Sequence, residues 1–155
     1  MSLRIAVAGA AGRMGRRIIA LAAEQTDLAL VAALESAGSP HQNQDAGLLA
    51  GIRANQVAVS AEAKAEFDVL IEFTTAAATA RWLEVCLRRH RPIVIGTTGH
   101  DGAARDRIRD AGREIAVLHA PNMSVGVNVM LRAVRDLAAV LDAAYDVEIV
   151  EAHHR

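Results

Sequence analysis

Apolar residues in the first 35 positions form two continuous runs separated by a segment with helical spacing. Residues 4–8 are a short, mostly apolar run followed by glycine, which is typical of a strand buried on both faces. The next segment carries Met14, Ile18 and Leu21 at the helical period, with arginines between them, and predicts a helix with these three side chains inward. Residues 28–34 form the second run. The pattern predicts a βαβ unit.

The alternation of strands and helices continues as far as residue 118. Strands are predicted at residues 57–59, 68–73, 92–95 and 115–118, and helices at residues 45–49, 76–90 and 101–111. The side chains expected to face inward are Ala78, Trp82, Val85 and Cys86 in the second of these helices and Ala104, Ile108 and Ala111 in the third. Such alternation indicates an α/β fold, a Rossmann-like parallel sheet with helices on both faces.

The pattern changes after residue 121. Residues 125–141 predict one long helix with an apolar stripe, and residues 145–152 predict a strand. Because a strand needs partners, we interpret these elements as the first helix and strand of a truncated α+β substrate domain. The expected domains are a dinucleotide-binding Rossmann domain at 1–121, and a hinge with the start of a substrate-binding and oligomerisation domain at 122–155. An exposed stripe on the long helix would promote self-association.

Composition narrows the class of protein. Aromatic residues make up 3% of the 155 residues, so the core must consist mainly of Ala, Val, Leu and Ile. A net charge of −1 with interspersed signs gives no indication of a nucleic-acid surface. The single cysteine fits a reducing compartment, and no apolar run is long enough for a membrane span. The expected location is the cytoplasm, without a membrane or nucleic-acid partner.

Three glycines lie between the first strand and the first helix. Gly9, Gly12 and Gly15 follow the spacing G-x-x-G-x-x-G, which is one residue looser than the dinucleotide-binding G-x-G-x-x-G. Glycines allow close approach of phosphates, and a helix N-terminus supplies free N–H groups and partial positive charge. The alternative is a tight turn that only packs the helix on the sheet.

An acidic residue stands where a dinucleotide site needs one. Glu35 ends the second strand about twenty residues beyond the turn, where a carboxylate accepts hydrogen bonds from the adenosine ribose. The alternative is a solvated strand-end carboxylate. Ser36 follows it, and a carboxylate disfavours a 2′-phosphate, so NADH is slightly favoured over NADPH. Nearby arginines at positions 13, 16 and 17 leave both cofactors open.

Several segments together resemble one family. These are residues 7–15, 33–35, 94–99 with G-T-T-G, 122–128 with N-x-S-V-G-V-N, and 151–155 with E-A-H-H-R. In this order they resemble dihydrodipicolinate reductase (4-hydroxy-tetrahydrodipicolinate reductase) of lysine and diaminopimelate biosynthesis. The resemblance implies hydride transfer from NADH or NADPH to a cyclic small-molecule dicarboxylate, giving tetrahydrodipicolinate, in a protein that is a homotetramer when complete.

The resemblance also implies roles for individual residues. Residues 9–14 would hold the pyrophosphate, Glu35 the adenosine ribose, and two later segments the nicotinamide half. The full set of cofactor-binding residues is Gly9, Ala10, Ala11, Gly12, Arg13, Met14, Gly15, Glu35, Gly96, Thr97, Thr98, Ala120, Pro121, Asn122 and Met123. His153 matches the catalytic histidine and His154 a contact to a substrate carboxylate. No metal is expected.

The chain departs from the family pattern at three places. The family continues to a proton-donating lysine and a substrate-binding G-T segment, neither of which follows here. Where the family commonly has an arginine after the ribose-binding acid, this chain has Ser36. Where the family usually has an aromatic residue near the alanine–proline pair, this chain has Met123. We therefore expect cofactor binding with little or no reductase activity by this chain alone. The alternatives are a non-catalytic dinucleotide- or CoA-binding Rossmann module, and another Rossmann dehydrogenase.

Overall fold

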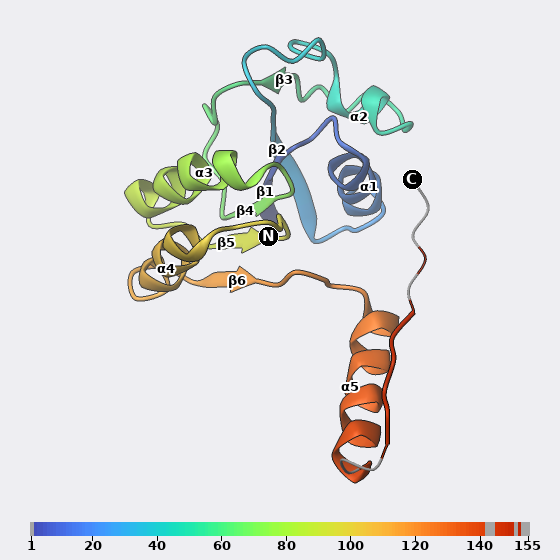
Figure 1. Ribbon diagram of the computed structural model, residues 1–155. Coiled ribbons are helices and arrows are strands. Elements are labelled where there is room, and N and C mark those ends of the chain that lie inside the picture. Colours follow the sequence, from blue (N-terminus) through green and yellow to red (C-terminus); the bar gives the residue numbers. More distant parts are fainter. Residues whose placement is uncertain (1, 142–144, 151, 153–155) are drawn as a thin grey trace. The chain divides into compact units, whose positions relative to one another are not determined.

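A computed structural model describes residues 2–141, 145–150 and 152, and the chain separates into two compact units, Met1–Pro121 and Asn122–Arg155 (Figure 1). The strands are β1 (Leu3–Ala8), β2 (Leu28–Leu34), β3 (Val59–Ser60), β4 (Val69–Glu72), β5 (Ile93–Ile95) and β6 (Val117–His119). The helices are α1 (Arg13–Ala22), α2 (Ala46–Leu49), α3 (Ala76–Arg89), α4 (Gly102–Ala111) and α5 (Val125–Val140).

The first unit is built on one six-stranded sheet with the order β3-β2-β1-β4-β5-β6. All neighbouring strands in it are parallel, and helices lie on both faces (Figure 1). The predicted fold class is therefore confirmed. The strand order reverses direction between β1 and β4, which in open α/β sheets is the point where ligands bind beyond the carboxyl ends of the strands.

The register brings the carboxyl ends of the strands into one row. Ala8, the last residue of β1, pairs with Leu34 of β2 on one side and with Glu72 of β4 on the other. Glu72 pairs with Ile95 of β5, which pairs with His119 of β6. Each of these residues ends its strand. The loops that carry the predicted site residues of the first unit therefore start from a single edge.

Two apolar clusters fill the space between the sheet and its helices. Alternate residues of β1 point to opposite faces, so that Ala6 packs with the α3 and α4 side and Ile5 with the α1 and α2 side. Cys86 lies fully buried in the first cluster, where burial raises the pKa of its thiol to about 12. Alanines at many core positions let the helices approach the strands closely, as the low aromatic content requires.

The inward face of α1 differs from the predicted stripe. The buried residues are Gly15, Ile19 and Ala22, whereas Met14 and Leu21 are 49% and 40% exposed. Gly15 and Ala22 let α1 approach the turn and the sheet closely, Ile19 fills the remaining space, and Met14 and Leu21 lie on the outer side. The prediction of Met14 and Leu21 as core residues was wrong.

The other helices agree better with the predicted faces. In α3, Trp82 and Cys86 are buried as expected, but they are joined by Thr79 and Leu83, while Ala78 and Val85 are half-buried. In α4 the buried residues are Ile108 and Ala111, with Ala104 half-buried. Strand and helix bounds otherwise shift by one or two residues, most visibly at β3 and β6.

The second unit contains α5, which begins where the Ser124 side chain accepts a hydrogen bond from the amide of Val127 at 3.4 Å. No residue of α5 is buried among the described atoms. Residues 145–150 and 152 form no strand, so the strand predicted at 145–152 is not present there. An extended segment becomes a strand only by backbone pairing, and no described segment pairs with it. No described helix has the length and apolarity to cross a membrane.

Candidate functional site

The glycine turn is fastened to the end of β2. The amides of Gly9 and Ala10 both donate to the carbonyl of Leu34, at 2.9 and 3.1 Å. Gly9 has a φ of +79°, a left-handed conformation that glycine adopts without steric penalty. The amide of Gly12 then donates to the carbonyl of Gly9 at 3.0 Å, which closes the turn before α1 begins. Gly12 stands at the N-cap of the helix, so the turn opens α1 as the sequence predicted.

Two of the glycines are required by close contact. A Cβ on Gly9 would lie 2.1 Å from the carbonyl oxygen of Phe73, the residue that follows β4. A Cβ on Gly15 would lie 2.1 Å from the carbonyl oxygen of Gly9 and 2.8 Å from the Cα of Ala10. Both glycines therefore have the packing role of a tight turn between helix and sheet. That role does not compete with phosphate binding, because the exposed backbone around Gly12 is left open.

The start of α1 has hydrogen-bond donors without a side-chain partner. Side chains cap the other described helices, with Asp45, Thr75, Asp101 and Ser124 each accepting a bond from a backbone amide at the helix start. Gly12 provides no such oxygen for α1. The first turn of α1 therefore presents unpaired N–H groups and the positive end of the helix dipole, which together favour an anion.

Glu35 lies directly against the turn. Its carboxylate accepts a hydrogen bond from the amide of Ala11 at 2.9 Å, across the end of the sheet, and a longer one from Ser36 at 3.4 Å. Arg16 holds the other side of the turn, since its Nε donates to the carbonyl of Ala11 at 2.7 Å. The acid and the glycine turn that the sequence placed together are thus in contact. Glu35 is half-buried, and Ser36 is exposed.

A cavity of about 300 Å³ opens beside this contact. One side comes from the turn and the end of β2, at Gly9, Gly12 and Glu35. The opposite side comes from the start of α3 and the loop before it, with Thr74, Thr75, Ala78, Arg81 and Trp82. Sequence reasoning placed the first side and missed the second, whose residues carry no motif. The size and mixed polarity suit a nucleoside.

A buried carboxyl group links the loops after β4 and β5. Glu72 is fully buried and accepts hydrogen bonds from the hydroxyl groups of Thr97 at 2.8 Å and Thr79 at 3.4 Å, and from the hydroxyl of Thr74. The amide of Thr74 donates to the Thr97 hydroxyl at 2.7 Å. No predicted site residue other than Thr97 belongs to this network. The sequence did contain one signal for this network, because Glu72 is an acidic residue at the end of an otherwise apolar strand.

The G-T-T-G segment divides into buried and exposed parts. Thr97 is 4% exposed, while Thr98 and Gly99 are open to solvent. A Cβ on Gly96 would lie 2.1 Å from the ring of Phe73, so that only glycine fits beside this ring. The segment is therefore fixed at Gly96 and Thr97 and presents Thr98 outward. This arrangement is consistent with an ordinary tight turn as well as with a ligand-binding one.

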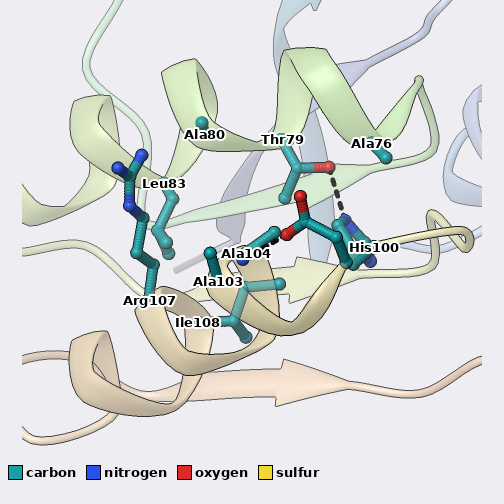
Figure 2. Close-up of a pocket in the computed structure, with 10 residues that line it drawn as sticks. Ala76, Thr79, Ala80, Leu83, His100, Ala103, Ala104, Arg107 and Ile108 are labelled. Carbon is teal, nitrogen blue, oxygen red and sulfur yellow. Dashed lines mark hydrogen bonds between the residues drawn. The ribbon is translucent and has the colours of Figure 1, made fainter.

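The network ends at a second, smaller cavity between α3 and α4 (Figure 2). The Nε2 of His100 lies 3.0 Å from the Thr79 hydroxyl, and the His100 ring meets that of His119 edge-on at 5.1 Å. The cavity measures about 200 Å³, and the apolar part of its lining consists of alanines with Leu83 and Ile108. Figure 2 shows His100 at one end and Arg107 at the other. Among the described residues no three groups are arranged to hold a metal ion.

The remaining predicted residues lie at and beyond the boundary of the units. The amide of Ala120 donates to the carbonyl of Ile95 at 3.2 Å, which ties this residue to the strand-end row. Asn122 accepts a bond from the amide of Ser124 at 2.8 Å, and Met123 is 41% exposed. Pro121 ends the first unit, and Asn122 and Met123 belong to the second. His153 and His154 lie outside the described residues.

Comparison with known sequences identifies relatives over nearly the whole chain. A family model described as "Dihydrodipicolinate reductase, N-terminus" matches residues 3–123. The 4-hydroxy-tetrahydrodipicolinate reductase of Nitrosomonas eutropha is 49% identical over 155 residues, covering 99% of this chain and 58% of the relative. That of Thiobacillus denitrificans is 47% identical over 158 residues, covering 100% and 59%. The chain thus spans less than two thirds of the length of these relatives.

Solved structures share the fold. Dipicolinate-bound dihydrodipicolinate reductase from Paenisporosarcina sp. TG-14 superposes with a TM-score of 0.70 at 23% identity, covering 90% of this chain and 54% of that one. Aspartate semialdehyde dehydrogenase II from Vibrio cholerae, complexed with ASA, gives a TM-score of 0.60 at 16% identity, covering 88% and 47%. At these identities the likeness concerns the fold alone.

Proposed function

This chain belongs to the dihydrodipicolinate reductase family, and from that membership we propose that residues 1–121 bind NADH or NADPH for the reduction of a cyclic dicarboxylate. Because the chain spans 58% of a relative named 4-hydroxy-tetrahydrodipicolinate reductase, that activity is proposed for the complete protein. The observation that carries the proposal is the contact between Glu35 and the glycine turn at the uncapped start of α1.

The turn fits a pyrophosphate. Gly9 and Gly15 leave no side chain between the strand end and the helix, and Gly12 is exposed where α1 begins. The unpaired amides of the first turn of α1 would donate to phosphate oxygens. Residues 9–15 would bind in this way mainly through their backbone, which explains why positions 10, 11 and 14 need no polar side chain.

Glu35 fits the adenosine ribose. One carboxylate oxygen is held by the Ala11 amide, which fixes the side chain at the rim of the 300 Å³ cavity. Its acceptor capacity would bind the ribose hydroxyl groups. A carboxylate repels a 2′-phosphate at short distance, and on this ground we favour NADH slightly over NADPH.

The nicotinamide half would lie at the β5 and β6 ends of the strand-end row. Residues 96–98 and 120–123 are proposed to line it. When bound, the cofactor supplies a hydride from C4 of its nicotinamide. The protein's part is positioning, because Glu72 holds Thr97, and the Phe73 ring packs against Gly96, so that the segment is fixed before a ligand arrives.

Residues 122–155 are proposed to be a hinge and the beginning of the substrate domain. His153 would act in catalysis and His154 would bind a substrate carboxylate, and a group from the rest of that domain would supply the proton. We expect this chain by itself to bind cofactor with little turnover. The complete protein would be a cytoplasmic homo-oligomer without nucleic-acid or membrane partners. The expected difference in reductase activity is tested by measuring tetrahydrodipicolinate formation by this chain and by the complete protein.

The binding proposal is tested by calorimetric titration of the chain with NADH, NADPH and CoA. Both nicotinamide dinucleotides should bind and CoA should not.

A variant at the glycine turn tests the place of binding. Gly12→Asp would put a carboxylate at the helix start, where it caps α1 and repels phosphate. The new Cβ lies 3.1 Å from the Gly9 carbonyl, so a small adjustment of the turn is needed.

Gly12→Asp should abolish dinucleotide binding while the chain stays folded. Gly102→Asp adds the same charge at the start of α4, where no atom lies within 4 Å of the new Cβ, and should leave binding intact. Tight CoA binding, or undiminished NADH binding by Gly12→Asp, would contradict the proposal.

The substrate class is tested on the complete protein. There 2,6-pyridinedicarboxylate, a planar cyclic dicarboxylate, should compete with the substrate.

A further inference from the structure

Arg81 occupies the wall of the nucleoside-sized cavity opposite Glu35. It comes from α3, an element that sequence reasoning did not connect with the cofactor. The residues that line this cavity include Glu35, Ser36 and Arg81, and Arg81 is the one arginine among them. Arg81 therefore borders the same cavity as the carboxylate proposed to bind the ribose.

The charge of Arg81 is not neutralised by a neighbouring acid in the described part of the chain. Two other arginines of α3 do have acidic partners, since Arg88 lies 3.6 Å from Glu84 and Arg89 lies 3.7 Å from Glu66. No carboxylate of the described residues lies within 4 Å of the Arg81 guanidinium. The lining of the cavity thus includes a carboxylate held by the glycine turn and a guanidinium without a carboxylate partner among the described residues.

The Arg81 guanidinium is also held in place. Its Nη2 donates to the carbonyl of Ala61, in the segment after β3, at 2.6 Å. Its central carbon lies 4.8 Å from the centre of the Trp82 ring, a cation–π distance. Trp82 is 4% exposed, so this support is rigid. With one N–H group used by Ala61, four remain for a ligand.

The arginines of the glycine turn are differently placed. Arg16 is engaged with the carbonyl of Ala11, and neither Arg13 nor Arg16 lines the cavity. Position 36, directly after the acid, is a serine with an exposed side chain. A cation for this end of the cofactor is therefore provided by α3 alone among the residues that line the cavity.

We propose that Arg81 recognises the 2′-phosphate of NADPH, in place of an arginine at position 36. The proposal rests on the proposed function, because it assumes that the cavity holds the adenosine half of a dinucleotide. A guanidinium binds a phosphate dianion through paired N–H bonds, and the Ser36 side chain is small enough to leave room. Glu35 serves the ribose of NADH and Arg81 the added phosphate of NADPH, so the domain accepts both.

The test compares the two cofactors in calorimetric titrations of three variants. Arg81→Gln should weaken NADPH binding by ~3- to 5-fold, the loss expected for one charge-assisted pair open to solvent, and NADH binding by less than ~2-fold. Arg88→Gln, two turns further along the same helix, is the matched control and should alter neither affinity. Ser36→Arg in the Arg81→Gln background should restore NADPH binding.

Each outcome decides a different point. An equal loss of both cofactors in Arg81→Gln, or no loss of either, overturns the role of Arg81 in phosphate recognition, and so does failure of Ser36→Arg to restore NADPH. NADH binding serves as the internal check that Arg81→Gln leaves the site folded. If the unaltered chain binds neither dinucleotide, the proposed function itself fails, independently of any variant.

Discussion

The hydroxyl of Thr97 donates to the buried carboxyl group of Glu72 at 2.8 Å and accepts from the amide of Thr74 at 2.7 Å. Through these two bonds the loop after β5 is joined to the loop after β4. This hydroxyl thereby helps to set the spacing of two loops that the proposed cofactor would contact. The next threonine, Thr98, is exposed and takes no part in the network.

The paired threonines allow a controlled test of this network. Thr97→Val keeps the shape of the side chain but removes the hydroxyl, so that the buried Glu72 loses a donor and the Thr74 amide loses an acceptor. We expect the free energy of unfolding to fall by ~1–3 kcal/mol. Thr98→Val should change it by less than ~0.5 kcal/mol. Urea unfolding curves measure both, and equal effects would show that the buried bonds contribute nothing specific.

The packing of α1 against its turn predicts the effect of a single methyl group. Gly15→Ala puts a Cβ 2.1 Å from the Gly9 carbonyl oxygen, so helix and turn must separate. We expect a loss of ~1–3 kcal/mol in stability, together with weaker dinucleotide binding. Gly102→Ala meets no atom within 4 Å and should be neutral or stabilising by up to ~1 kcal/mol. Thermal unfolding measures the stability of both variants, and titration with NADH measures their affinity. A Gly15→Ala variant with unchanged stability and affinity would contradict the prediction.

Glu35 can be altered with retention of its shape. Glu35→Gln keeps an oxygen to accept from the Ala11 amide but removes the negative charge. The NADPH affinity should rise relative to that for NADH by ~3- to 10-fold, because repulsion of the 2′-phosphate disappears. Glu24→Gln, an exposed acid just beyond α1, is the control. If the ratio of the NADPH and NADH affinities is unchanged in Glu35→Gln, the 2′ position of the adenosine ribose does not lie near Glu35.

The pair of Arg4 and Asp68 predicts how stability depends on pH. Arg4 donates side-chain hydrogen bonds to Asp68, the shorter at 2.7 Å, and its backbone amide donates another at 2.9 Å. These bonds lower the pKa of the Asp68 carboxyl to about 2, against about 3.9 in an unfolded chain. Since the folded pKa is the lower one, the contribution of Asp68 is complete above pH ~4 and is lost as the pH falls towards ~2.

Asp68→Asn should therefore destabilise the chain at neutral pH and flatten the part of the stability profile between pH ~4 and ~2. Arg4→Gln should act in the same way, and the double variant should lose less than the sum of the two. Denaturant unfolding at a series of pH values provides the measurement. Additive losses would mean that the two residues act independently.

The parts of the fold that could be predicted are those with a local signal. The strands are continuous apolar runs ended by glycine or a polar residue, and the order of strand, turn, helix and strand is enough to place Glu35 beside Gly12. A short helical piece was also predicted near residues 45–49, where α2 forms with Asp45 as its N-cap. These features depend on neighbours in the chain, which the sequence displays directly.

Features that depend on distant neighbours were missed. The inward face of α1 consists of Gly15, Ile19 and Ala22. A search for large apolar side chains misses Gly15, whose contact with the turn fixes this face, and selects Met14 instead. Thr79 and His100 are polar yet buried, since Glu72 and one another satisfy their hydrogen bonds. Arg81 reaches the nucleoside cavity only through the packing of α3. The strand expected at 145–152 does not form in the described residues, because a strand requires backbone pairing with a neighbour and an apolar sequence pattern alone does not supply it.

The uncapped start of α1 also has a consequence for how long the domain survives. A ligand that binds only the folded state stabilises it by RT ln(1 + [L]/Kd), about 2.7 kcal/mol at a hundredfold excess over Kd. On the proposed function, a dinucleotide phosphate binds at this helix start, and the unfolded fraction of the domain then falls as the concentration of free dinucleotide rises. Depletion of dinucleotide would then raise the population open to proteolysis, and Gly12→Asp, which should abolish binding, would remove that dependence.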